Sequence, residues 1–197
     1  MSVAPRDLTA FILAGGNSTR MGTDKAFVML EGRTLLARAL EICRTITSEV
    51  RIVGDRKKFA PFASVVEDVF PGCGPLAGIH AALRASQTHL NLILAVDLPF
   101  VSAGLLHFLV AQARDSAAIL TVPRAGKGWQ PLCAVYRRAF ADAAETALRE
   151  GRYKIDTLFE DALTHAVGEA DLRSAGFSPE IFRNLNTPEE LAEARKS

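Results

Sequence analysis

The sequence predicts an α/β protein whose sheet is doubly wound and mostly parallel, with an antiparallel element towards the C-terminal half. Three observations predict this fold. Short apolar runs alternate with stretches of helical periodicity from residue 8 to residue 122. The run 91–96 is almost continuously apolar, which is typical of a central strand buried on both faces. Later apolar runs lie closer together, and this spacing favours antiparallel pairing at one side.

The N-terminal elements follow from apolar periodicity and from helix-start signals. Apolar residues recur on one helical face over 34–47, Pro75 suits the first position of a helix, and Ser102 suits an N-cap. The expected strands are 8–13, 50–53, 64–67 and 91–96, and the expected helices are 34–47, 75–86 and the stretch after Ser102.

The C-terminal elements are shorter and more closely spaced. We expect strands near 117–122, near 131–136 and at 181–185, helices near 138–149 and 153–161, and a short final helix. The polar, glycine-rich stretch 123–129 is predicted to be a mobile loop. Because no repeat or linker interrupts the chain, residues 1–197 are predicted to form a single domain.

Composition excludes several classes of protein. A net charge of +1 with 23% charged residues excludes a disordered acidic chain and a strongly basic nucleic-acid binder. Cys43, Cys73 and Cys133 are far apart and form no C-x-x-C motif, so we expect neither disulfides nor a zinc site. The four histidines lack metal-site spacing and are interpreted as surface or packing residues. The N-terminal apolar run is too short to span a bilayer and carries no cleavage pattern, which predicts a cytoplasmic protein with no membrane partner.

The loop that leaves the first strand has the composition of a phosphate-binding segment. Residues 13–25 read Leu-Ala-Gly-Gly-Asn-Ser-Thr-Arg-Met-Gly-Thr-Asp-Lys. Glycines let backbone N–H groups approach a ligand, and Arg20 and Lys25 add two cations that suit a polyphosphate. The spacing matches neither the Walker A loop nor the dinucleotide fingerprint. The alternative interpretation is an ordinary turn that is rich in glycine.

Two carboxylates follow expected strands, where ligands of open parallel sheets bind. Asp97 directly follows the run 91–96, and its charge there needs a cation or hydrogen-bond donors. We interpret Asp97 as a Mg²⁺ ligand rather than as a helix cap. Asp68 precedes the glycine-rich turn 72–78, whose helix start offers free N–H groups, and it is either a ligand contact or a turn residue.

The stretch 182–191 combines an expected strand end with a capping box. Thr187 is the predicted cap and Glu190 its reciprocal partner. Asn186 has no such structural explanation and is a candidate second oxygen ligand. Phosphate-binding cations, a strand-end carboxylate and no visible nucleophile predict nucleotidyl transfer, because the substrate then supplies the nucleophile.

The loop 13–25 resembles the signature loop of the molybdenum cofactor guanylyltransferases. The segments 74–78, 97–100 and 184–191 are similar to further motifs of that family and stand in the same order. The resemblance spans nearly the whole chain and implies a Rossmann-like sheet of the nucleotide-diphospho-sugar transferase type. It implies transfer of GMP from Mg²⁺-bound GTP to the terminal phosphate of molybdopterin, with release of pyrophosphate.

The resemblance also implies roles for individual residues. Catalysis falls to Arg20, Lys25 and Asp97, and Asp97 binds Mg²⁺ with Asn186 near the metal. Further GTP contacts come from Leu13, Ala14, Gly15, Gly16, Asp68 and Gly78, and the pterin side is formed by Gln130, Pro131, Asn184 and Asn186. Molybdopterin-handling proteins and acceptor molybdoenzymes are the implied protein partners.

One departure and two rival functions accompany the resemblance. Some family members carry an Asn after the second strand, where this chain has Val53-Gly54-Asp55, so that nucleotide contact is missing or is made by the backbone or by Asp55. A cytidylyltransferase acting on the same pterin is the nearer rival; the pair Gly15-Gly16 favours the larger purine over it. A non-catalytic nucleotide sensor is the other rival, and it has no need of a metal ligand such as Asp97.

Overall fold

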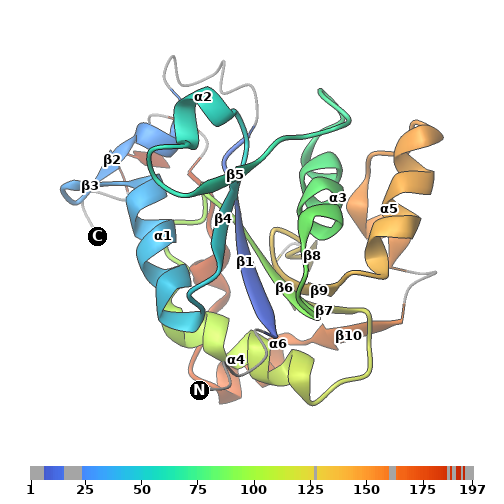
Figure 1. Cartoon of the computed structure of the whole chain (residues 1–197). Coiled ribbons are helices and arrows are strands. Elements are labelled where there is room, and N and C mark those ends of the chain that lie inside the picture. Colours follow the sequence, from blue (N-terminus) through green and yellow to red (C-terminus); the bar gives the residue numbers. More distant parts are fainter. Residues whose placement is uncertain are drawn as a thin grey trace, which may run out of the picture.

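A mixed sheet organises the molecule (Figure 1). The computed structural model describes residues 7–15, 24–126, 128–159, 163–185, 187, 190, 191 and 193. Within these residues the strands follow the order β10-β7-β9-β6-β1-β4-β5, and β8 pairs with β7 outside this path. The strands are β1 (Leu8–Leu13), β4 (Val50–Val53), β5 (Ser64–Val66), β6 (Leu90–Ala95), β7 (Leu120–Ala125), β8 (Gly128–Trp129), β9 (Cys133–Arg137) and β10 (Thr164–Val167).

The strand directions confirm the predicted mostly parallel sheet with an antiparallel element. β1 runs parallel to both β4 and β6, β4 runs parallel to β5, and β7 runs parallel to β10. β9 is antiparallel to its neighbours β6 and β7. Leu13 is in register with Val53 on one side and with Ala95 on the other. The carboxyl ends of β1, β4 and β6 therefore meet at one edge of the sheet.

Helices cover both faces of the sheet, as expected for a doubly wound fold. Figure 1 shows α1 (Leu35–Ile46) and α4 (Ala103–Arg114) on one face, and α3 (Pro75–Ala85) and α5 (Phe140–Arg149) on the other. Successive side chains of a strand point to opposite faces. Accordingly Ile12 and Leu94 belong to the core under α1 and α4, whereas Phe11 and Ile93 belong to the core under α3 and α5.

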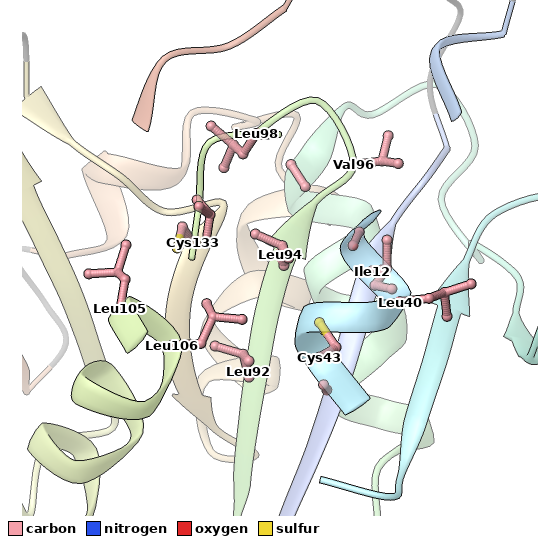
Figure 2. Close-up of a cluster of buried hydrophobic side chains, with 14 of the residues drawn as sticks. Ile12, Leu40, Cys43, Leu92, Leu94, Val96, Leu98, Leu105, Leu106 and Cys133 are labelled. Carbon is pink, nitrogen blue, oxygen red and sulfur yellow. The ribbon is translucent and has the colours of Figure 1, made fainter. Parts of the chain in front are cut away.

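Figure 2 shows the first of these cores. Side chains of the central strands, among them Ile12 and Leu92, meet Leu40 and Cys43 of α1 and Leu106 of α4. The α1 and α4 faces that meet the sheet are buried in a helical pattern, which explains why their periodicity was readable from sequence. None of the helices in the described part of the chain combines the length and apolar character needed to cross a bilayer.

The predicted helix starts are confirmed. The Ser102 hydroxyl accepts the N–H of Leu105 at 3.2 Å and caps α4. The Thr34 hydroxyl accepts the N–H of Ala37 at 3.1 Å and caps α1. Pro75 occupies the start of α3, after Gly74 with a φ of 72°. These caps satisfy helix-end donors, so each helix begins where its own sequence directs it.

Three expectations for the C-terminal half are wrong. Among the described residues of the expected helix 153–161, which end at Phe159, the structure has the 3₁₀ turn η2 (Ile155–Leu158). This turn already buries Ile155 and Leu158, so their burial does not need a longer helix. The segment 181–185 is not a strand: η3 (Pro179–Phe182) ends there, and the backbone beyond it pairs with a turn instead of a ladder. The stretch 123–129 is not a loop, since β7 and β8 pair across it as a hairpin.

Several short elements were not expected from the sequence. They are η1 (Lys25–Phe27), the hairpin β2 (Met29–Leu30) and β3 (Arg33–Thr34), α2 (Arg56–Phe59), β10 and α6 (Glu169–Ser174). Each is too short for a hydrophobic period to be recognised. The hairpin and η1 nevertheless matter, because they lead from the phosphate-loop segment into α1.

Candidate active site

The candidate site lies at the sheet edge where β1, β4, β5 and β6 end. β1 leads into Ala14 and Gly15, β5 leads to Asp68, and β6 leads to Asp97. The parallel register brings these chain ends side by side although they are far apart in sequence. The structure thus gathers the predicted segments where an open parallel sheet binds its ligands.

An ion pair between Lys25 and Asp97 is the centre of this site. Lys25 Nζ lies 3.1 Å from Asp97 Oδ2, across 72 positions of sequence. Both side chains are about one-fifth exposed, so the pair is neither a solvated surface bridge nor sealed in the core. The expected need of Asp97 for a cation is therefore met by Lys25. The alternative of a helix cap is excluded, because Ser102 caps α4.

The carboxylate of Asp97 keeps one oxygen for a further ligand. Its Oδ2 receives Lys25, whereas its Oδ1 has no hydrogen-bond partner among the described residues. The described residues also contain no group of three or more His, Cys, Asp or Glu side chains placed to hold a metal. A Mg²⁺ ion bound by one carboxylate, with substrate phosphates and water as its other ligands, fits this donor set.

Lys25 is held in place by its preceding residue. Asp24 Oδ1 accepts the N–H of Ala26 at 3.1 Å and caps η1, and Asp24 Oδ2 lies 3.0 Å from Lys58 Nζ on α2. Ala26 is fully buried, which anchors η1 in the core under α1. Residues 16–23, including the predicted Gly16 and Arg20, lie outside the described residues. The link from Asp24 to α2 had no signal in the sequence.

The backbone that follows β1 is tied to β4. The N–H groups of Ala14 and Gly15 donate to the same Val53 carbonyl, at 3.0 and 3.1 Å, and the Leu13 carbonyl accepts the N–H of Val96 at 3.1 Å. The carbonyls of Ala14 and Gly15 accept no hydrogen bond from the described residues. This edge of the site therefore offers carbonyl acceptors to a ligand, while its N–H groups are already used.

The segment after β4 is committed to local structure. Asp55 Oδ1 accepts the N–H of Lys57 at 2.7 Å and caps α2. A Cβ on Gly54 would come within 2.8 Å of the Phe59 ring, so the glycine is required by packing. The segment Val53-Gly54-Asp55 is thus a tight helix start, and the Asp55 side chain is engaged by the backbone of α2.

Asp68 occupies a partly buried turn beside the site. Its Oδ1 accepts the N–H of Phe70 at 2.8 Å, which gives the residue a turn-forming role. Burial raises the pKa of the Asp68 carboxyl, and the Phe70 N–H and the nearby His80 partly offset that shift. Gly72 and Gly74, with φ values of 80° and 72°, then turn the chain into α3. Gly78 is buried against Leu13, where a Cβ would lie 3.5 Å from Leu13 Cδ2.

The C-terminal segment lies against the Asp97 turn although no strand forms. The N–H of Leu185 donates to the Asp97 carbonyl at 3.0 Å, and the Arg183 guanidinium lies 4.4 Å from the Phe100 ring centroid. Asn184 is exposed, and the predicted ligand Asn186 lies outside the described residues. These contacts bring the predicted C-terminal motif to the site by a route that sequence periodicity did not reveal.

The predicted capping box is confirmed. The N–H of Thr187 donates to Glu190 Oε2 at 3.1 Å, and the N–H of Glu190 donates to the Thr187 hydroxyl at 3.2 Å. This reciprocal pair explains both side chains structurally.

The predicted pterin-side residues Gln130 and Pro131 lie between β8 and β9, in a segment that reaches the end of β6. The N–H of Ala95 donates to the Leu132 carbonyl at 2.8 Å, which places the segment beside the Asp97 turn. The Gln130 amide nitrogen donates to the Ala125 carbonyl at 3.1 Å, and the Pro131 carbonyl accepts the Tyr136 hydroxyl at 2.8 Å. Gln130 and Pro131 therefore also stabilise the hairpin itself.

A cavity of about 430 Å³ adjoins the same turn on the side of α1. Leu98 and Pro99 contribute to its wall. Its charged rim is paired internally, because Arg33 contacts Glu41, and Arg38 lies 2.8 Å from Glu31. The cavity includes neither Lys25 nor Asp97 in its lining, so it is separate from the ion pair.

Comparison with known proteins decides the family. A family model described as the MobA-like NTP transferase domain matches residues 10–166. The chain belongs to this family. Membership confirms the predicted nucleotidyltransferase and the resemblance found in the motifs.

Relatives of this MobA-like chain match it over nearly its full length. A protein named probable molybdenum cofactor guanylyltransferase, from Pelotomaculum thermopropionicum, is 34% identical and covers 95% of this chain and 91% of its own. A molybdenum cofactor guanylyltransferase from Desulfosudis oleivorans is 33% identical, with coverages of 95% and 94%. The crystal structure of molybdopterin-guanine dinucleotide biosynthesis protein A from Archaeoglobus fulgidus is 30% identical and superposes with a TM-score of 0.83, covering 95% and 97% of the two chains.

Proposed function

We propose that this protein transfers GMP from Mg²⁺-bound GTP to the terminal phosphate of molybdopterin and releases pyrophosphate. The observation that carries the proposal is the Lys25–Asp97 pair at the carboxyl edge of the sheet, in a chain whose relatives are named for this activity. The acceptor phosphate brings its own nucleophile. The protein then has to position two anionic substrates and neutralise charge in the transition state.

Asp97 and Lys25 have different proposed roles in this transfer, one toward the metal and the other toward the leaving group. Asp97 Oδ1 would hold Mg²⁺, which neutralises the phosphates and orients the α-phosphate when it is bound. Lys25 would leave Asp97 for the triphosphate and stabilise the charge that develops on pyrophosphate. We assign Arg20 to the same leaving group, and Asn186 as a second oxygen ligand near the metal, because Leu185 ties the preceding backbone to Asp97.

The carbonyl edge at Ala14 and Gly15 supports guanine as the base. Guanine presents two neighbouring donor groups on its Watson–Crick edge, N1–H and the 2-amino group, which match carbonyl acceptors. Cytosine presents a single amino donor on that edge and would leave an acceptor unpaired. We propose that Leu13, Ala14, Gly15 and Gly16 contact the base and ribose in this way, and that Asp68 and Gly78 complete the nucleoside pocket.

The hairpin and the C-terminal segment are proposed to face the pterin. Gln130 and Pro131 precede Leu132, whose carbonyl accepts the N–H of Ala95 at the end of β6. Exposed Asn184 precedes Leu185, whose N–H donates to the Asp97 carbonyl. We further propose that residues 1–197 act as one domain in the cytoplasm. Proteins that deliver molybdopterin, and enzymes that accept the finished cofactor, are the proposed partners.

Pyrophosphate release with molybdopterin and each of the four nucleoside triphosphates tests the proposal. We expect release with GTP and at most a small fraction of that rate with CTP, UTP or ATP. Strong preference for CTP would replace the guanylyl assignment by cytidylyl transfer on the same fold. Binding of GTP without release under any condition would indicate a nucleotide sensor.

A further inference from the structure

His80 on α3 is buried with one ring nitrogen unsatisfied. Its side chain is 4% exposed, and Nε2 lies 3.4 Å from both Glu145 Oε2 on α5 and Arg84 Nε one turn along α3. Its Nδ1 is buried and has no hydrogen-bond partner among the described residues. Neither tautomer satisfies both nitrogens, since Nδ1 then lacks either an acceptor or a donor.

The contacts of Glu145 do not explain this histidine. Glu145 Oε2 already receives Arg84 at 2.6 Å, and Glu145 Oε1 receives Arg149 at 2.7 Å. A leucine at position 80 would pack between α3 and α5 without an orphaned polar atom, which is the more stable choice for a helix interface. The pairing with Glu145 therefore leaves Nδ1 without an explanation, and the other contacts of the ring have to be considered.

The His80 ring also contacts the turn that carries Asp68. The Phe70 ring meets the His80 ring edge-on, with centroids 5.2 Å apart and an angle of 73° between the planes. The N–H of Phe70 in turn donates to Asp68 Oδ1 at 2.8 Å. The Phe70 N–H and the nearby His80 are also the two influences that offset the effect of burial on the pKa of Asp68.

We infer that His80 is a positioning residue, which holds the Asp68–Phe70 turn so that the Asp68 carboxylate faces the nucleoside of the bound nucleotide. The inference rests on the proposed function, in which Asp68 contacts the nucleoside. It extends the site to α3 and α5, through Glu145, Arg84 and His80 to Phe70. None of these side chains needs to touch the nucleotide.

Removal of the imidazole separates this role from simple packing. In the full chain, His80→Leu is expected to raise the dissociation constant for GTP about tenfold, as does loss of one hydrogen bond to a ligand. The kcat at saturating GTP should stay within about twofold, because the reacting phosphates lie at Asp97. The thermal midpoint should stay equal or rise, since the orphaned Nδ1 is gone. A residue that only packs would instead change the midpoint and leave GTP affinity unaltered.

A double-mutant cycle shows whether His80 acts through Asp68. Asp68→Asn alone should weaken GTP binding about tenfold, and adding His80→Leu should weaken it no further. Phe70→Leu, which keeps the imidazole but removes the ring contact, should weaken binding about threefold and serves as a second probe if His80→Leu does not fold. His107→Leu, on the exposed side of α4, is the matched control and should bind GTP like the wild type.

The outcomes separate this inference from the proposed function. Unchanged GTP affinity in His80→Leu and Phe70→Leu would overturn the positioning role. A double variant of His80→Leu and Asp68→Asn whose loss of GTP affinity equals the product of the two single losses would overturn it as well. Binding constants are measurable whether or not transfer occurs. A wild type that binds GTP but releases no pyrophosphate would remove the proposed activity and leave the His80 result to stand by itself.

Discussion

Asp55 and Asp97 follow parallel strands at the same edge of the sheet, yet the structure uses them differently. Asp55 directly precedes α2, and its Oδ1 accepts the N–H of Lys57 at 2.7 Å. Asp97 is followed by a turn, and the helix beyond it is capped by Ser102. Because α2 begins directly after Asp55, the Asp55 carboxylate caps that helix. Because α4 begins several residues after Asp97, the Asp97 carboxylate remains available for a cation and pairs with Lys25.

The largest expected effect comes from Asp97. Asp97→Asn should lower kcat for pyrophosphate release about 10³-fold, because the amide no longer offers an anionic ligand to Mg²⁺. The thermal midpoint should change by no more than about 2 °C, since the residue caps no helix. Asp142→Asn is the matched control, because the Asp142 side chain is 78% exposed on α5 and its carboxylate lies 2.9 Å from Arg84. Normal turnover in Asp97→Asn would place the metal elsewhere.

The next effect separates Lys25 from the other lysines. Lys25→Met should lower kcat/KM for GTP about 10²-fold, because the leaving pyrophosphate loses a cation. Lys25→Arg should recover part of the loss, since charge rather than shape is needed first. Lys57→Met, on exposed α2, is the control and should retain wild-type kinetics. Equal losses of kcat/KM in Lys25→Met and Lys57→Met would mean that Lys25 acts through the overall positive charge of the protein rather than through a specific contact with the pyrophosphate.

A smaller effect, on stability alone, is expected from Asp55. Asp55→Ala should lower the free energy of unfolding by about 1 kcal/mol through loss of the α2 cap. For a chain of this length that corresponds to a fall of about 2–4 °C in the thermal midpoint. The kcat and KM should match the wild type. A loss of GTP affinity beyond the loss of folded protein would give Asp55 the nucleotide contact that its position in the family suggests.

The smallest effect on stability concerns Asp68 and depends on pH. Burial raises the folded-state pKa of this carboxyl above its ordinary value of 3.8, so the folded state holds the proton more tightly than the unfolded state. The contribution of Asp68 to stability is thus most favourable below 3.8 and declines as pH rises through the folded-state pKa. Asp68→Asn, whose amide oxygen still accepts the Phe70 N–H, should therefore unfold at an equal or higher temperature at pH 7. A clear fall in midpoint at neutral pH would make Asp68 a structural residue like Asp55.

The sequence was sufficient for elements that bury a long periodic face. The strands β1, β4 and β6 and the helices α1, α3 and α4 were predicted because their apolar residues repeat over whole elements and their caps are local. The segment 181–185 was misread, because Ile181, Phe182 and Leu185 are apolar but pack as a 3₁₀ turn and an irregular strap against Asp97. Hydrophobic periodicity does not reveal a segment that is held in place by a long-range hydrogen bond.

The site was predictable in its residue types but not in its contacts. Lys25 and Asp97 were recognised from their positions after strands, whereas their pairing needed the register of β1 with β6. His80 was interpreted as a surface or packing residue, since nothing in the sequence places it against Phe70 and the turn of Asp68. Long-range side-chain contacts of this kind follow from the assembled sheet, which no local pattern encodes.

Metal binding tests the central claim most directly, because it compares the two carboxylates without requiring turnover. Mn²⁺ is titrated by electron paramagnetic resonance into the wild type, Asp97→Asn and Asp55→Asn, each saturated with a non-hydrolysable GTP analogue. The wild type and Asp55→Asn should bind one Mn²⁺ with equal affinity, and Asp97→Asn should bind it at least about tenfold more weakly. Equal Mn²⁺ affinity in all three proteins would contradict the assignment of Asp97 as the metal ligand.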